Sequence, residues 1–216
     1  MKRKIAFIIC SILILAVFMV GCGKETDVPD GMKLASNEEN KFYTMYVPED
    51  WYVIETGSNV TLAQAQSKQM GGTTSLEPVT VNAMIFGISD PELVGSENID
   101  KSCAEYYKTY QEQMAGTFKE FYNLTNLDEA HASPYREDAR AYSFVALYNN
   151  IYYKYYMTVI VRGQTYYVIT FNFPQNNVEA DKDGNLIKTE YEKAEFDDGD
   201  YNDEIKDVVS SFKAKL

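Results

Sequence analysis

The stretch that decides the fold runs from Arg140 to Phe173 and reads RAYSFVALYNNIYYKYYMTVIVRGQTYYVITFNF. It contains three runs rich in aromatic and β-branched residues, with two short turn sequences between them: 140–148, 152–161 and 165–173, separated by Asn149-Asn150 and by Arg162-Gly163-Gln164. Asparagine and glycine accept the positive backbone angles of tight turns, so the stretch predicts an antiparallel meander of three strands. Both faces of these strands are apolar or aromatic, which requires cover on both sides of the sheet.

Periodic apolar residues predict that this cover is helical. They recur three or four apart from Asn98 to Tyr122 and again from about Asp200 to Lys215. Further strands are expected at 42–47, 79–88 and 121–127. The sequence therefore predicts an α+β fold, an α/β/α sandwich in which an antiparallel sheet of about six strands is flanked by helices.

The first 22 residues read as a targeting segment. Lys2, Arg3 and Lys4 precede a predominantly apolar run from Ile5 to Val20, and Gly21-Cys22 follows. This is the pattern of a secretory signal peptide, and the junction Met19-Val20-Gly21-Cys22 resembles the bacterial lipobox. An uncleaved membrane anchor is the alternative, because the apolar run approaches the ~17 residues that a spanning helix needs.

The lipobox resemblance, together with the length of the remaining chain, implies three parts. Residues 1–21 are expected to be a lipoprotein signal peptide, 22–31 a lipidated tether that begins at Cys22, and 32–216 a single domain. Either interpretation of the leader places the domain at the cell membrane, facing outside the cytoplasm. The membrane is then a partner through the lipid anchor.

Charge narrows the possible partners further. The chain carries a formal net charge of −12, and loss of the basic leader makes the remainder more negative. Such a surface repels nucleic acid and anionic lipid headgroups, so neither is an expected ligand. A protein or another envelope component is the expected partner, and the oligomeric state is not predicted.

The residues that could carry chemistry are few. Of three cysteines, Cys10 leaves with the leader and Cys22 takes the lipid, so Cys103 has no disulfide partner and is expected to be a buried apolar side chain of the first helix. The single histidine, His131, has a serine two residues away, but neighbours at that spacing do not form a triad. No zinc motif or glycine-rich phosphate loop occurs, so the sequence predicts no catalytic residue, no metal or other cofactor, and no enzyme.

Glu179 to Glu190, EADKDGNLIKTE, supports a second hypothesis. Its acids at positions 1, 3, 5 and 12 and its glycine at position 6 follow the ligand order of a calcium loop. Asp183-Gly184 is equally a strong turn pair, so a plain β-hairpin is the alternative. The tyrosine runs leave a similar choice, between ordinary sheet packing and a platform on which sugars stack.

Three sequence segments resemble the PsbP-like family. They are FYTMYVPEDW at 42–51 near the start, and YYVITF at 166–171 followed by VVSSF at 208–212 near the end. The resemblance covers about residues 32–216 and implies a non-enzymatic domain that docks on membrane-associated complexes. The expected function is a lipid-anchored, extracytoplasmic, non-catalytic binding lipoprotein of undefined process. A calcium-responsive or small-ligand-binding lipoprotein that uses 179–190 is the alternative.

Overall fold

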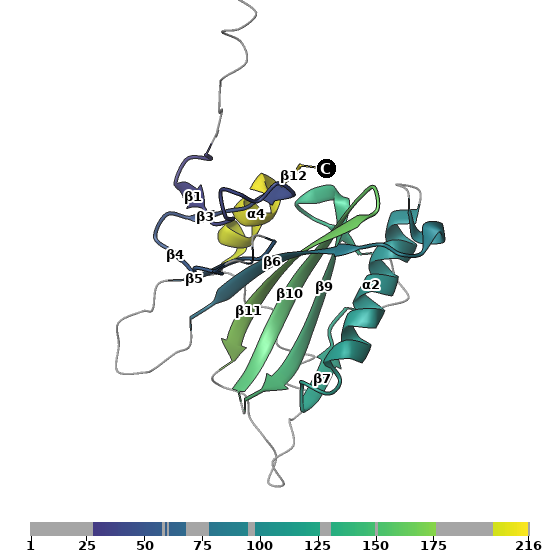
Figure 1. Cartoon of the computed structure of the whole chain (residues 1–216). Helices are drawn as coiled ribbons and strands as arrows, with labels where there is room; N and C mark the ends of the chain where they lie inside the picture. The colour runs from purple at the N-terminus through teal and green to yellow at the C-terminus, as the bar shows by residue number, and fades with distance from the viewer. Residues whose placement is uncertain are drawn as a thin grey trace, which may run out of the picture.

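The computed structural model describes residues 28–57, 59, 61–67, 78–94, 98–125, 131–149, 151–175 and 201–215 (Figure 1). These residues form, in chain order, β1 (Met32–Leu34), β2 (Tyr43–Thr44), β3 (Tyr46–Pro48), β4 (Tyr52–Val53), β5 (Ala63–Gln66), β6 (Thr80–Gly87), a 3-10 turn (Pro91–Leu93), α2 (Ile99–Met114), β7 (Glu120–Asn123), β8 (Ala132–Ser133), β9 (Arg136–Tyr148), β10 (Ile151–Arg162), β11 (Thr165–Gln175), α4 (Asn202–Ser211) and β12 (Lys213–Ala214).

The predicted meander is confirmed and forms the centre of the molecule. Strands β9, β10 and β11 pair antiparallel in an eight-stranded sheet of order β4-β5-β6-β11-β10-β9-β7, with β8 also paired to β9. Asn149 and Gly163 have positive φ angles of 51° and 54°. These are the backbone conformations that the two turn sequences predict.

The sheet buries a cluster of side chains on each of its two faces. Neighbouring residues of one strand belong to different clusters: Ile160 packs with α4, whereas Val159 packs with α2. This division follows from the period of two in a strand, which points successive side chains to opposite faces. The meander is therefore apolar on both faces because both are covered.

The cover itself differs from the expected sandwich. On one face α2 lies along β9 and β10 (Figure 1). On the other, α4 packs together with β3 and with the short strands at the start of the chain. Among the described residues the fold is therefore a predominantly antiparallel sheet with two helices, and the α/β/α description holds only in part.

Three element boundaries were predicted wrongly. The strand expected at 42–47 is two short strands in separate small sheets, because β3 pairs with β1 while β2 pairs with β12. The first helix ends at Met114 rather than continuing to Tyr122, since the amides of Thr117 and Phe118 both donate to the Met114 carbonyl. The last helix ends at Ser211, and Lys213–Ala214 is a strand.

No helix within the described residues is long and apolar enough to cross a bilayer. The leader, residues 1–22, lies outside the described part of the chain.

Gly163 tests the meander. In Gly163→Ala the added Cβ meets nothing within 4 Å, so the only cost is the positive φ of 54°. We expect the free energy of unfolding, measured by urea titration, to fall by about 1 kcal/mol. Gly87→Ala is the matched control, because Gly87 is equally open and its φ is not positive. Equal stability of the two variants would contradict the assignment of this turn.

Candidate functional site

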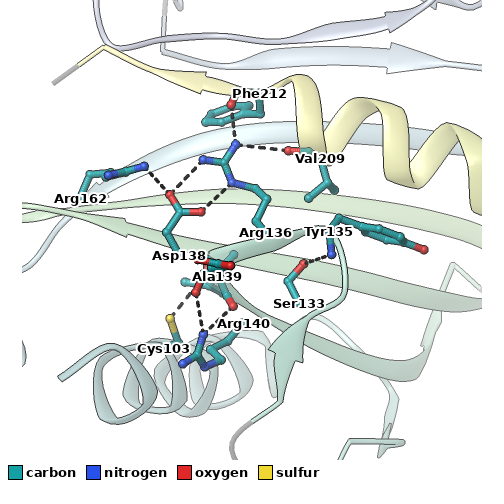
Figure 2. A network of polar contacts seen from close by, with 12 residues as sticks. Cys103, Ser133, Tyr135, Arg136, Asp138, Ala139, Arg140, Arg162, Val209 and Phe212 are labelled. Atoms are coloured by element: carbon teal, nitrogen blue, oxygen red, sulfur yellow. Dashed lines mark hydrogen bonds and ion pairs between the residues drawn. The ribbon is translucent and has the colours of Figure 1, made fainter. Parts of the chain in front are cut away.

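A cluster of charged side chains lies where β9 and β10 meet the end of α4 (Figure 2). Arg136 holds Asp138 with two hydrogen bonds, Nε to Oδ1 at 2.8 Å and Nη2 to Oδ2 at 3.0 Å. Arg162 reaches the same carboxylate at 2.6 Å from its Nη2. One carboxylate thus joins two guanidinium groups on neighbouring strands.

The third guanidinium nitrogen of Arg136 binds the C-terminal end of α4. Its Nη1 donates to the carbonyl oxygens of Phe212 at 2.5 Å and Val209 at 3.4 Å (Figure 2). The last carbonyls of a helix have no partner within the helix and carry partial negative charge, so a guanidinium satisfies them and is favoured there. Arg136 therefore holds α4 against the sheet, and its donors are occupied by structural contacts.

Asp138 is stabilised in its charged form. Burial is the largest single influence and acts to raise the pKa of this carboxyl. The hydrogen bond from Arg136 and the charges of Arg136 and Arg162 outweigh it, so the pKa lies below its ordinary value of 3.8. The carboxylate is ionised at neutral pH and is committed to its two arginines.

The thiol of Cys103 lies below this cluster, on the α2 face. Its side chain is buried, as predicted, and Sγ donates to the Val159 carbonyl at 3.6 Å. Burial raises the pKa of Cys103 to about 12, although the nearby Arg140, itself ion-paired to Asp100, acts to lower it. A thiol that stays protonated is a poor nucleophile and a poor metal ligand, so Cys103 acts as a packing group.

A second polar cluster lies at the far edge of the sheet. The Glu120 carboxylate accepts hydrogen bonds from the Tyr122 hydroxyl at 2.7 Å and from the Tyr152 hydroxyl at 3.0 Å. Burial, and then the hydrogen bond to Glu120, raise the pKa of both tyrosines. Both hydroxyls remain neutral donors, and the hydrogen bond from Tyr152 links β10 to β7 across β9.

The other residues singled out from the sequence are not brought into a reactive group. Cys22 and Glu179–Glu190 lie outside the described residues, so neither the lipidation nor the calcium hypothesis is examined by this structure. His131 is partly buried just before β8, and the Ser133 hydroxyl accepts from the Tyr135 amide. Within the described ranges no three His, Cys, Asp or Glu side chains form a group that could hold a metal ion.

Comparisons with known proteins give no assignment. No protein-family profile and no curated protein matches the sequence. Several solved structures are similar. One is a protein of Bacteroides thetaiotaomicron VPI-5482, at 12% identity and a TM-score of 0.44 over 81% of this chain and 46% of that one. Another is the cyanobacterial PsbP (CyanoP) of Synechocystis sp. PCC 6803, at 14% identity and a TM-score of 0.40 over 90% of this chain and 97% of that one.

This chain spans about half the length of the Bacteroides protein. Both TM-scores lie below 0.5, so the PsbP-like resemblance stays a prediction from the sequence.

Asp138→Asn tests the charged cluster. The substitution keeps the shape but leaves Arg136 and Arg162 without their carboxylate, so we expect a loss of about 1–2 kcal/mol in the free energy of unfolding at pH 7. The lowered pKa means that the carboxylate stabilises the fold above pH 3.8 and that this contribution is lost as pH falls below it.

The difference between Asp138→Asn and the unsubstituted chain should therefore shrink in urea titrations near pH 3. Glu137→Gln is the control, because Glu137 is the exposed acid next to Asp138. A pH-independent difference would show that Asp138 does not act through its charge.

Proposed function

We propose that this chain is a lipid-anchored, extracytoplasmic, non-catalytic domain that binds another protein or an envelope component. The observation that carries the proposal is the leader, in which a basic start and an apolar run end at the lipobox-like Met19-Val20-Gly21-Cys22. Under this proposal Cys22 carries the lipid and the domain works at the membrane surface.

The short distance from the anchor to the fold supports a role close to the membrane. The first described strand begins at Met32, and the roughly ten residues from Cys22 to that point reach at most ~35 Å. Strand β1 pairs with β3 beside α4, whereas the β9–β10 turn lies at the opposite end of the sheet (Figure 1). The lipid would hold the β1–β3 end nearest the bilayer and leave the long strands pointing away from it.

The chemistry of the described side chains also favours binding over catalysis. The donors of Arg136 are taken up by Asp138 and by the carbonyls of α4, and the Cys103 thiol is buried with a raised pKa. Groups committed in this way stabilise the fold and are not poised to react with a substrate.

Crosslinking in living cells tests the proposal. The full-length protein is crosslinked, affinity-purified and analysed by mass spectrometry beside a Cys22→Ala chain that cannot be lipidated. We expect a specific partner that is enriched with the unsubstituted chain and lost with Cys22→Ala. Identical partners for both chains, together with no mass added at Cys22, would overturn the lipid-anchored assignment.

A calcium-responsive role for 179–190 is the alternative, favoured by the order of its acids. An ion that binds only the folded state raises its stability. Thermal melts in millimolar calcium and in chelator should then differ for the full chain but not for an Asp181→Asn, Asp183→Asn double variant. Superimposable melts of the unsubstituted chain would rule this role out.

A further inference from the structure

The sheet presents six neutral polar side chains on one face. They lie in two rows that cross β5, β6 and β11: Gln64–Asn82–Thr170 and Gln66–Thr80–Asn172. We call these six residues the carboxamide face. Neighbouring strands are ~4.8 Å apart, so with the adjoining β4 the rows extend over ~14 Å.

Strand alternation places all six on the face opposite α4. Ala63 and Ala65 in β5 and Val81 and Ala83 in β6 are buried in the cluster that contains α4. The intervening residues of β5 and β6 are only partly buried and point the other way. This is the face that α2 covers, but α2 reaches β6 and β11 at Phe86 and Tyr166, near the β10–β11 turn and away from both rows.

The side chains of the carboxamide face have unused hydrogen-bonding capacity. None of them makes a hydrogen bond to another described residue, and the Asn172 Oδ1 atom is buried without a partner. A carboxamide offers two donors and one acceptor oxygen, and a threonine hydroxyl donates and accepts. An unpaired buried polar atom such as Asn172 Oδ1 is destabilising. The donors and acceptors that a ligand can reach are those of the partly exposed Gln64, Gln66, Thr80 and Asn82.

The face is also free of charge, although the chain as a whole carries −12. None of the described residues in these two rows is Asp, Glu, Lys or Arg. An aromatic ring stands at each end of the second row, where Tyr52 pairs with Gln66 and Tyr155 pairs with Asn172. Tyr52 is 52% exposed, and Tyr155 is buried against the α2 cluster.

We propose that the carboxamide face binds a neutral glycan, a chain of uncharged sugar residues. Sugar hydroxyls donate and accept as carboxamides do, and the apolar faces of sugar rings pack on exposed tyrosine. A nucleic acid or an acidic polysaccharide needs cationic side chains, which the two rows do not contain. Protein-binding patches have an apolar centre with Trp, Tyr or Arg anchors, whereas the centre of this face is Gln, Asn and Thr.

The inference deepens the proposed function by naming the class of envelope component, and it rests on that function only in assuming that the chain binds something. The two can fail separately, because glycan binding is measured on purified protein and needs neither the lipid nor a cellular partner.

Calorimetric titration tests the inference. The full-length chain is purified in a detergent without sugar headgroups and titrated with a tetramer of glucose, a tetramer of N-acetylglucosamine and, as the charged comparison, a sulfated oligosaccharide. We expect at least one neutral tetramer to bind and the sulfated one not to bind. The two neutral probes distinguish a ligand read by hydroxyls alone from one read by acetamido groups as well.

Variants place the binding on this face. Asn82→Ala and Gln66→Ala should each weaken the affinity roughly three- to tenfold, the usual effect of one hydrogen bond. Thr80→Val removes only the hydroxyl from the row that contains Gln66 and keeps the side-chain shape. A weaker affinity in this variant therefore reflects a lost hydrogen bond and not a folding defect. Gln164→Ala is the matched control, because Gln164 is exposed in the β10–β11 turn, away from both rows.

The proposal is overturned if neither neutral tetramer binds, or if the sulfated probe binds more tightly than both. It is also overturned if Asn82→Ala, Gln66→Ala and Thr80→Val bind with the same affinity as Gln164→Ala.

Discussion

The structure depends on one constraint: strands β9, β10 and β11 must be covered on both faces at once. On the α2 side Phe144 is fully enclosed, and its ring stacks on Phe121 and on Tyr155, each with a centroid separation of 4.5 Å. Phe171 is equally buried on the α4 side. Each fully buried side chain of this size contributes about 1.5–3 kcal/mol, so exposure of either face removes several such contributions together.

The two faces are covered by helices of different length, and each helix combines apolar packing with an arginine contact to β9. Helix α2 is long and holds its face mainly by aromatic packing, as in the stacked rings of Tyr107 and Tyr142. Helix α4 is shorter and is fastened by the Arg136 guanidinium at its end. Both helices are thus held to β9 by an arginine, α2 through the Arg140–Asp100 ion pair and α4 through Arg136, and the part of the sheet beyond α2 retains neutral polar side chains.

The sequence was most informative where the signal is local. Asn149 and Gly163 mark turns by their own backbone preferences, and the run of aromatic and β-branched residues between them indicates a strand without reference to the rest of the chain. The end of α2 was missed because Phe118 continues the helical spacing and still joins the same buried cluster after the chain has turned. The apolar periodicity marks positions that become buried, and here the buried positions continue beyond the end of the helix.

Contacts between distant parts of the chain could not be predicted in this way. The Arg136 cluster depends on the carbonyl of Phe212, which lies 76 residues later in the sequence. The local signal for this cluster is the charged sequence Arg136-Glu137-Asp138 at the start of β9. The carboxamide face likewise exists because β5, β6 and β11 come into register. A single sequence shows the alternation of each strand but not which strands lie side by side.

The pairing of β2 with β12 sets an order of events for the growing chain. Thr44 pairs with Lys213, and the Lys215 side chain donates to the Asn40 carbonyl at 2.7 Å. Residues 43–44 therefore have no strand partner until 213–214 are present, and pairings this distant in sequence form slowly. A chain cut short by only a few residues keeps the whole central sheet but leaves β2 as an open edge, which other chains can join.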